Sequence, residues 1–338
     1  MVFCALQPEY TSSEQSNWIS IHQPLVVLVG PTGIGKSRIA IHLAKTFGTE
    51  ILTADSTQVY KGMDIGTDTP STTEQEGVPH RLINIVHPDE SFSAGTYRRL
   101  ALQDITRLHQ GGLLPLVVGG TGLYVRVLVR GIWPSPSVDW ALRRQLEQDC
   151  ERCGLVALYQ ELQEVDPVSA RVLHPHDRGK VLRALEIYRQ LGVPLSEMHR
   201  RHQQTRQSFP VLLMGLRMDR DALYRRIEER VEFELEKGLV EETRGLLEAG
   251  YSRELTSMKS LGYRQIAGYL QGEYSYEEAV RQLKRDTRHF AKRQMTWFRK
   301  EPHIEWIDIH DLESFSDIAQ RIEGRIQAFS EECLHWDA

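Results

Sequence analysis

The chain has 338 residues, a formal net charge of −5, and an ordinary mixture of 41% hydrophobic and 26% charged residues. This composition excludes a collagen-like fibre, a chain that is disordered throughout and, with only four cysteines, a fold held by several disulfides. No apolar run approaches the roughly 18 residues that a membrane-spanning helix needs, so no membrane partner is expected. The length predicts two domains.

The first twenty residues are polar and lack both a basic start and a long apolar stretch. They do not have the features of a secretory or organellar targeting segment. Residues 1–20 are therefore expected to be a disordered tail, and the protein is expected to be cytoplasmic. No obligate protein partner is indicated, and a monomer is the expected state.

Short apolar segments alternate with helical patterns in the first third of the chain. Residues 25–29 (LVVLV) form a continuous apolar run that is typical of a buried parallel strand. Further strands are predicted at residues 50–54, 82–86 and 116–118, and helices at residues 38–47 and 96–110. This alternation predicts an α/β fold with a mostly parallel sheet flanked by helices.

The alternation stops at residues 133–137 (WPSPS), whose composition predicts a linker. Residues 136–206 show only helical periodicity, which predicts an inserted all-helical domain. The α/β pattern then returns, with strands at residues 211–216 and 303–307 and helices at residues 220–237, 239–249 and 276–299. The predicted core comprises residues 21–135 and 207–315, followed by a C-terminal helix or tail at residues 316–338.

A glycine-rich segment follows the first predicted strand and precedes the first predicted helix. It reads Gly30-Pro31-Thr32-Gly33-Ile34-Gly35-Lys36-Ser37 and matches the phosphate-binding pattern G-x-x-x-x-G-K-[ST]. Backbone N–H groups of such a loop converge on phosphate oxygens, and the helix N-terminus adds partial positive charge. Lys36 is placed to reach the phosphates and Ser37 to hold Mg²⁺. The segment predicts a P-loop NTPase-like fold with a di- or triphosphate ligand and a magnesium cofactor.

The acidic residues near this loop limit the types of reaction that the site could catalyse. An NTP-hydrolysing enzyme of this fold carries an acid at the end of a second apolar strand, but the strand at residues 116–118 is followed by Gly-Gly-Thr. Asp55 instead follows the strand at residues 50–54. Because the carboxyl ends of parallel strands line the ligand crevice, we expect Lys36, Asp55 and Thr121 to converge. Asp55 could order Mg²⁺ through water, accept a proton from a nucleophile, or only stabilise a turn.

Positive charge is concentrated in one predicted helix. Residues 281–300 contain eight Lys or Arg and one Asp, a local net charge of +7, so the rest of the chain carries −12. Arg281, Arg285, Arg288 and Lys292 are spaced to share one helical face. Such a stripe on an acidic protein indicates a polyanionic partner, although a solvated surface face gives the same pattern.

Several ordered segments together resemble the tRNA dimethylallyltransferases, also called tRNA isopentenyltransferases. The resemblance extends from about residue 25 to about residue 308, nearly the whole chain after the tail. Besides the phosphate loop, it rests on residues 55–67 (DSTQVYKGMDIGT), 79–82 (PHRL), 118–124 (VGGTGLY), 183–186 (RALE), 261–265 (LGYRQ) and 287–297 (TRHFAKRQMTW). Each segment alone is weak evidence for the family, but the whole set, in this order and at matching spacing, makes the resemblance specific.

The resemblance implies transfer of a dimethylallyl group from dimethylallyl diphosphate to N6 of the tRNA adenosine just 3′ of the anticodon (position 37), with Mg²⁺ needed. It implies that the phosphate loop binds the prenyl diphosphate and that Lys36 stabilises the departing diphosphate. Asp55 would take the N6 proton. Arg226 would clamp the diphosphate, with Arg225 and Arg230 as alternative matches.

The resemblance also implies contacts with the anticodon stem-loop of tRNA. Thr121 would orient the reacting groups, and the insertion at residues 136–206 would reach along the anticodon stem. Arg143 is a further, weaker match to an RNA contact. The implied RNA-binding residues are Asp55, Ser56, Thr57, Gln58, Thr121, Arg143, Gly179, Lys180, Val181, Leu182, Arg183, Lys259, Ser260, Leu261, Gly262, Tyr263, Arg264, Gln265, Thr287, Arg288, His289, Phe290, Ala291, Lys292, Arg293 and Gln294.

Three other functions fit parts of the sequence. A small-molecule kinase with the same phosphate loop predicts ATP turnover with a small acceptor. An adenylate isopentenyltransferase predicts activity on AMP or ATP and weak affinity for tRNA. An RNA-binding module with a relict nucleotide site predicts tRNA binding without a product. The basic helix and the large insertion favour the tRNA enzyme over the first two.

Overall fold

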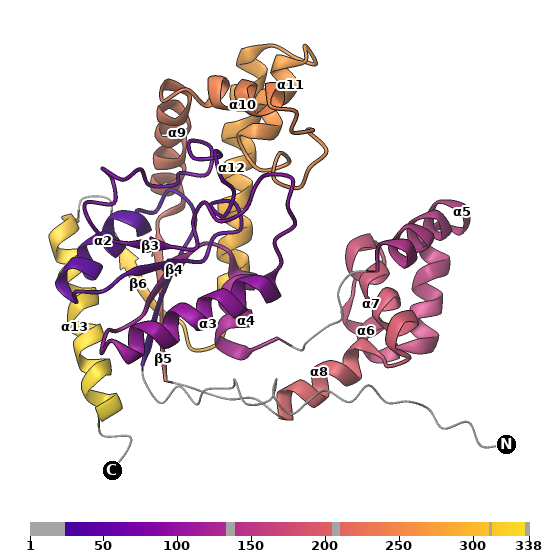
Figure 1. Ribbon diagram of the computed structural model, residues 1–338, viewed down its shortest axis with the longest axis horizontal. Coiled ribbons are helices and arrows are strands. Elements are labelled where there is room, and N and C mark those ends of the chain that lie inside the picture. Colours follow the sequence, from indigo (N-terminus) through magenta and orange to yellow (C-terminus); the bar gives the residue numbers. More distant parts are fainter. Residues whose placement is uncertain (1–23, 133–138, 205–209, 311–312, 335–338) are drawn as a thin grey trace. The chain divides into compact units, whose positions relative to one another are not determined.

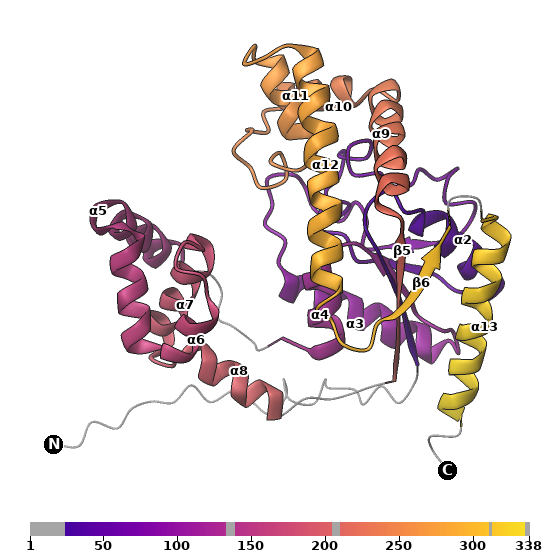
Figure 2. The same cartoon turned by 180° about the vertical axis from the view of Figure 1, so that it is seen from behind.

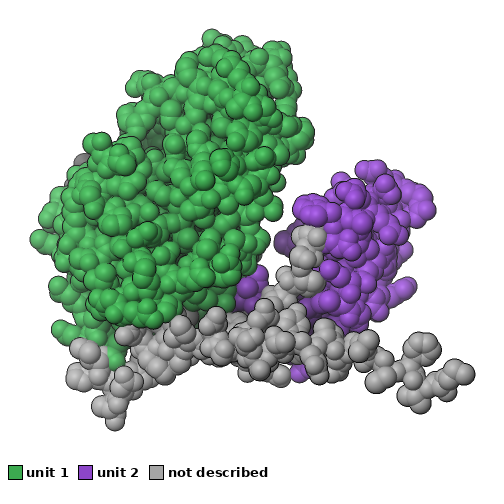
Figure 3. Space-filling view, viewed as in Figure 1, with its two compact units in different colours: residues 1–129, 209–338 green, residues 130–208 purple. Residues whose placement is uncertain are grey.

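A computed structural model describes residues 24–132, 139–204, 210–310 and 313–334. Two compact units are distinguished, one from the described parts of residues 1–129 and 209–338 and one from those of residues 130–208 (Figure 3). The first is an α/β core and the second contains the insertion that was predicted at residues 136–206. The predicted tail at residues 1–20 and the linker at residues 133–137 lie outside the described residues.

Within the described residues, six parallel strands form one sheet in the order β3-β2-β4-β1-β5-β6 (Figure 1). The predicted α/β fold with a parallel sheet is confirmed. The strands are β1 (Leu25–Val29), β2 (Ile51–Thr53), β3 (His80–Arg81), β4 (Leu116–Gly119), β5 (Val211–Met218) and β6 (Glu305–Ile309).

The strand β1 lies between β4 and β5 and leads directly into the phosphate loop. Its central residue, Val27, pairs with Val117 on one side and Leu213 on the other. All five of its side chains are completely buried. A parallel strand covered on both faces needs apolar residues at every position, which explains the continuous run in the sequence. The phosphate loop thus follows a fully buried strand that is paired on both sides.

Two strands lie at positions other than those predicted. The prediction of a strand at residues 82–86 was wrong, because β3 comprises only His80–Arg81. Leu82 has a φ of 64°, and this left-handed conformation ends the extended strand. The last strand, predicted at residues 303–307, starts two residues later as β6. Here His303, with a φ of 65°, turns the chain just before the strand.

Helices surround the sheet and extend past the carboxyl ends of its strands. Helices α9, α10 and α11 stand beyond that end, and the long α12 runs back along the core (Figures 1 and 2). The sequence patterns do not predict α4 and α11, which are short. The helices of this unit are α2 (Lys36–Thr46), α3 (Ala94–Gln110), α4 (Gly122–Arg130), α9 (Arg220–Glu236), α10 (Leu239–Glu248), α11 (Tyr263–Leu270), α12 (Tyr276–Phe298) and α13 (Phe315–Leu334).

The second unit contains only helices in its described part. They are α5 (Trp140–Val165), α6 (Pro167–Val172), α7 (Arg178–Leu191) and α8 (Leu195–Gln204). Leu146, Leu162 and Leu185 are fully buried in its separate apolar core. Asp166 joins α6 to α8, because its carboxylate accepts hydrogen bonds from Ser169 N at 3.0 Å and Ser196 Oγ at 2.6 Å. No helix in the described ranges has the length and apolar character needed to cross a membrane.

The carboxyl ends of β2 and β4 approach so closely that Gly119 has no room for a side chain. A Cβ on Gly119 would lie 2.1 Å from the backbone oxygen of Ala54. Gly119→Ala is therefore expected to lower the free energy of unfolding by about 3 kcal/mol. Gly245→Ala is the matched control, because nothing lies near that position within α10 and alanine there raises the free energy of unfolding by about 1 kcal/mol. Urea denaturation measures both, and equal effects would contradict the close approach.

Candidate active site

The phosphate loop has the backbone that its glycines predict. Gly33 and Gly35 have φ angles of 79° and 97°, in the left-handed region that residues with a Cβ rarely adopt. The loop therefore turns sharply enough for Lys36 to begin α2 and fold back, where its Nζ donates to Pro31 O at 2.9 Å. Ser37 is exposed beside it. This geometry places a charged amine and a hydroxyl at the N-terminus of a helix.

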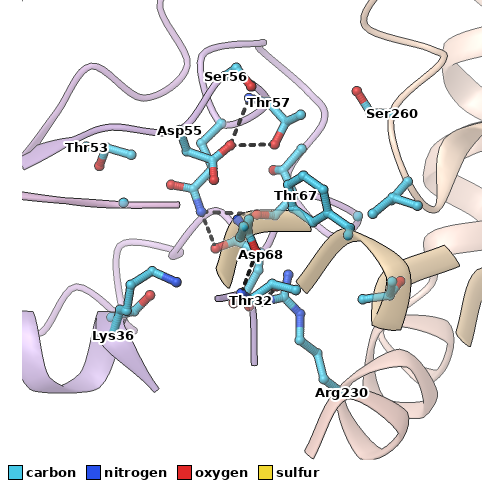
Figure 4. A pocket seen from close by; sticks show the side chains of 18 of the residues that line it. Thr32, Lys36, Thr53, Asp55, Ser56, Thr57, Thr67, Asp68, Arg230 and Ser260 are labelled. Atoms are coloured by element: carbon cyan, nitrogen blue, oxygen red, sulfur yellow. Dashed lines mark hydrogen bonds and ion pairs between the residues drawn. The ribbon is translucent and has the colours of Figure 1, made fainter. Parts of the chain in front are cut away.

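A cavity of about 320 Å³ opens above the phosphate loop and lies wholly within the α/β unit. Figure 4 shows Lys36, Asp55 and Arg230 entering it from three different elements. Thr32, Ser37 and Asp68 also line it. Of the three residues predicted to converge, Lys36 and Asp55 line this cavity and Thr121 does not. The other walls are formed by residues 56–58, 66–67, 259–261 and 264, and by one face of α12 (Leu283, Thr287, Phe290, Arg293 and Gln294).

The charges inside the cavity act on one another. Burial lowers the pKa of Lys36 to about 8, with the nearby Arg230 acting in the same direction and the carboxylates of Asp55 and Asp68 opposing it. Burial also favours the neutral form of Arg230, but Asp68 and Glu234 outweigh it and raise the pKa of that guanidinium. In this cavity the positive charge of Lys36 is destabilised by burial, whereas that of Arg230 is stabilised by its acidic neighbours. An incoming anion would stabilise both cations.

Asp55 is fixed by the turn that follows β2. Its Oδ1 accepts hydrogen bonds from Thr57 N at 2.9 Å and Thr57 Oγ1 at 2.7 Å. Its Oδ2 has no hydrogen bond to the described residues and belongs to a side chain that lines the cavity. Stabilising the turn therefore uses only Oδ1 of Asp55, and Oδ2 is available to a ligand.

Thr121 supports this turn from behind. Its Oγ1 accepts a hydrogen bond from Ser56 N at 3.0 Å, and its own N–H donates to Ala54 O at 3.1 Å. Thr121 is not among the residues that line the cavity. Thr121 therefore holds Ala54 and Ser56, the residues on both sides of Asp55, and does not itself form a wall of the cavity.

The arginine beside the phosphate loop is Arg230, not the predicted Arg226. Arg230 Nη1 donates to Thr32 Oγ1 at 2.9 Å and pairs with Asp68 at 3.1 Å, and its Nε donates to Glu234 at 2.7 Å. Arg226 lies one helical turn earlier on α9 and does not line the cavity. Positions four residues apart share a helix face, so sequence spacing alone does not separate them. The contact with the loop makes Arg230 the candidate diphosphate clamp.

Gln294 connects α12 to the phosphate loop. Its Oε1 accepts the N–H of Thr32 at 2.9 Å, and its Nε2 donates to Gly120 O at 3.0 Å. The side chain is only 6% exposed. Sequence reasoning placed it among RNA contacts, whereas the structure uses its whole amide to join the loop to the turn that carries Thr121. A long-range contact of this kind leaves no signal in local sequence.

The predicted RNA-binding residues of the α/β unit divide by exposure. Those buried by protein are Gly262, Tyr263, Gln265, Thr287, Ala291 and Gln294, and of these Thr287 and Gln294 also line the cavity. Those exposed or half-buried are Asp55, Ser56, Thr57, Gln58, Thr121, Lys259, Ser260, Leu261, Arg264, Arg288, His289, Phe290, Lys292 and Arg293. Arg264, Lys259 and Arg293 lie at the cavity, whereas Arg288, His289 and Lys292 line shallow hollows elsewhere on α12.

Several cations of the basic helix already have acidic partners. Arg281 pairs with Glu278, Lys284 with Glu232, and Arg288 with Glu228. Lys292 and Arg293 have no acidic partner among the described residues. The stripe is therefore less positive than its sequence suggests, and its uncompensated charge lies toward the C-terminal half of α12.

The helical unit carries the remaining predicted RNA contacts. Gly179 and Lys180 are exposed at the N-terminus of α7, and Arg183 is half-buried. Arg143 Nη1 donates to the fully buried Glu186 at 2.7 Å. Val181 and Leu182 are 0% and 2% exposed and belong to the core of the unit, since a helix that packs on one face must bury part of any continuous segment.

Comparison with known proteins identifies close relatives. A sequence model of the family described as IPP transferase matches residues 58–301. The tRNA dimethylallyltransferase 2 of Geotalea uraniireducens (strain Rf4) is 48% identical over 298 residues, which cover 88% of this chain and 96% of the relative. The tRNA dimethylallyltransferase of Geobacter sulfurreducens is 46% identical over 301 residues, covering 89% and 97%.

Solved structures agree with these relatives. The crystal structure of a full-length tRNA isopentenylpyrophosphate transferase from Bacillus halodurans has a TM-score of 0.70 and 38% identity, covering 93% of this chain and 99% of that one. A eukaryotic dimethylallyltransferase, described in crystallographic snapshots of its action on tRNA, has a TM-score of 0.78 and 29% identity, covering 89% and 77%. The family model covers residues 58–301 and the relatives cover most of the chain, and the chain belongs to the IPP transferase family.

Proposed function

We propose that this protein transfers the dimethylallyl group of dimethylallyl diphosphate to N6 of the tRNA adenosine just 3′ of the anticodon, releasing diphosphate. The observation that carries the proposal is the single cavity that holds both a phosphate loop and the unpaired carboxylate oxygen of Asp55. Phosphate binding alone suits many reactions, but a base facing the loop suits attack by a nucleophile that must lose a proton. The relatives are named as tRNA dimethylallyltransferases.

The proposed reaction divides between the two sides of the cavity. N6 of the adenine attacks the carbon that bears the diphosphate, a C–N bond forms, and the C–O bond to the diphosphate breaks. Asp55 Oδ2 receives the N6 proton, while Oδ1 remains bonded to Thr57. Lys36, Arg230 and the backbone N–H groups of the loop stabilise the negative charge that grows on the leaving oxygen.

Oxygen donors beside the loop fit a magnesium cofactor. The Ser37 hydroxyl lines the cavity and makes no hydrogen bond to the described residues, and Asp55 lines the same cavity. Mg²⁺ prefers such oxygen ligands and usually binds through one or two protein groups together with substrate phosphates. When bound, the ion would neutralise charge on the diphosphate. Ser37 is the proposed protein ligand.

The tRNA adenosine has to leave its base stack to reach Asp55. Exposed cations near the cavity, namely Lys259, Arg264 and Arg293, are suited to the phosphates of the anticodon loop. Exposed Gly179 and Lys180 of the helical unit are proposed to contact the anticodon stem. A monomer acting in the cytoplasm, where tRNA is found, completes the proposal.

The acceptor is tested by measuring diphosphate release from dimethylallyl diphosphate in the presence of Mg²⁺. We expect release with an unmodified tRNA anticodon stem-loop that carries adenosine 3′ of the anticodon, and none with AMP or ATP at the same concentration. Release with AMP or ATP alone would instead assign an adenylate isopentenyltransferase. Transfer of a phosphate from ATP to a small acceptor would assign a kinase.

The lowered pKa of Lys36 predicts a pH dependence for substrate capture. In the free enzyme Lys36 loses its charge as pH rises through about 8, so kcat/KM for dimethylallyl diphosphate is expected to fall above that pH. The bound diphosphate stabilises the ammonium and raises the pKa of Lys36, so kcat at saturation should persist to higher pH. The pH profiles of both quantities check this. In Lys36→Arg, whose guanidinium stays charged, the residual kcat/KM should show no fall near pH 8, and a fall there would contradict the assignment.

A further inference from the structure

A carboxylate outside the cavity holds the loop that follows Asp55. Glu242 on α10 accepts hydrogen bonds from the backbone N–H groups of Asp64 at 3.0 Å and Ile65 at 3.0 Å, and a longer one from Gly66 at 3.4 Å. Among the described residues no Lys or Arg pairs with this carboxylate. Three consecutive N–H groups instead form a concave anion site, with the protein's own carboxylate as the anion.

Tyr263 completes this arrangement. Its hydroxyl donates to Glu242 Oε1 at 2.6 Å and accepts the N–H of Gly66 at 3.1 Å. The side chain is fully buried, and a Cβ on Gly66 would lie 2.6 Å from the Tyr263 ring. The contact is therefore tightly packed, unlike an exposed ion pair, which contributes little. Residues 64–66 are held in one conformation by a carboxylate and a phenol from two different helices.

The residues that follow this anchored segment enter the cavity. Asp68 pairs with Arg230 at 3.1 Å, and Arg230 donates to Thr32 Oγ1 of the phosphate loop at 2.9 Å. On the other side, Gln58 Nε2 donates to the carbonyl oxygens of Thr67 at 3.0 Å and Asp68 at 2.8 Å. A continuous series of contacts thus connects the anchored loop to the diphosphate end of the cavity.

We infer that Glu242 is a positioning residue for the diphosphate site, acting through the loop at residues 64–68 and Asp68 on the guanidinium of Arg230. The inference rests on the proposed function. Asp55 is held separately, by Thr57 and by the turn that Thr121 supports. Loss of the Glu242 anchor should therefore weaken the binding of the prenyl diphosphate without disturbing the proposed proton transfer.

Glu242→Gln tests this with almost no change in size. An amide N–H then replaces one of the two acceptor oxygens, so part of the set of hydrogen bonds that anchors residues 64–66 is lost. We expect KM for dimethylallyl diphosphate to rise about tenfold, with kcat within about twofold of the wild type and an unchanged pH profile of kcat. The matched control is Glu241→Gln, an exposed neighbour on the same helix whose only ion pair with a described residue is to Arg244 at 3.8 Å. It should leave both constants unchanged.

A double-mutant cycle with Arg230→Ala identifies the route. If Glu242 acts through Arg230, adding Glu242→Gln to Arg230→Ala should change kcat/KM by less than about twofold. An undiminished tenfold effect in that background would overturn the inference. A fall in kcat as large as the rise in KM would also overturn it, because general disruption of the fold would then be the cause.

Binding of inorganic pyrophosphate with Mg²⁺, measured by calorimetry on the full chain, separates the two proposals. We expect affinity about tenfold weaker in Glu242→Gln than in the wild type or in Glu241→Gln. Equal affinity in all three proteins would overturn the role of Glu242. If the expected difference is found but the wild type makes no product on tRNA, the positioning role stands and the proposed function fails.

Discussion

Replacing Asp55 with asparagine is expected to lower kcat/KM for prenyl transfer to tRNA by about 10²- to 10⁴-fold, the range typical of a general base. The amide oxygen of asparagine can still accept the hydrogen bonds from Thr57 N and Oγ1 that now end on Oδ1. The turn after β2 should therefore remain, while the basic oxygen that faces the cavity is removed. Single-turnover measurement of the modified nucleoside gives the rate, and thermal unfolding shows whether the fold is intact.

Thr57→Val is the matched control for this variant. It removes the 2.7 Å hydrogen bond from the hydroxyl but leaves the carboxylate and its contact with the Thr57 N–H. We expect a loss of less than about tenfold, because only one neutral hydrogen bond is removed. If Asp55→Asn were no slower than Thr57→Val, Asp55 would be a turn residue and the proton would have another acceptor.

Lys36→Met is expected to cause the second large loss, about 10²- to 10³-fold in kcat. Methionine keeps most of the unbranched side chain and removes the ammonium that lines the cavity at the phosphate loop. The loss should appear in kcat as well as KM, because charge on the diphosphate is greatest in the transition state. The same single-turnover assay measures it, with saturating dimethylallyl diphosphate.

The reference for this loss is Lys45→Met, which lies on the same helix. Lys45 is exposed and pairs with Glu76 at 2.6 Å on the protein surface, and its replacement should leave kcat unchanged. A purely structural role of Lys36 would show as a fall in thermal stability with kcat preserved in the folded fraction. That outcome would contradict the assignment of Lys36 to the leaving group.

The sequence predicts the part of the site whose residues are close together in the chain, namely β1, the phosphate loop and Lys36. The apolar run of β1, the glycines of the phosphate loop and Lys36 follow one another without interruption, so their geometry is set by neighbours in the chain. Asp55 was also found this way, because the ends of parallel strands meet at one edge of a sheet. The same reasoning misplaced β3, since apolar residues after His80 turn in a left-handed conformation at Leu82.

Long-range contacts account for what sequence reasoning missed. Arg226 and Arg230 share one face of α9, and the contacts of Arg230 with Thr32 and Asp68 distinguish them. The sequence places Gln294 in a basic helix and predicts that it contacts RNA. In the structure its amide joins Thr32 to Gly120. Glu242 carries no motif, because its partners are backbone N–H groups nearly 180 residues earlier in the chain. Side-chain contacts with backbone leave no complementary residue type for a pattern to show.

The most direct test of the central claim is mass spectrometry of nucleosides from an unmodified tRNA that carries adenosine 3′ of its anticodon. The tRNA is incubated with the full chain, Mg²⁺ and dimethylallyl diphosphate, and fragments are sequenced to locate any change. The account predicts the mass of one dimethylallyl group on that adenosine alone, and its loss in Asp55→Asn. An unmodified adenosine there, with the phosphate loop shown to bind pyrophosphate, would contradict the claim that this cavity prenylates tRNA.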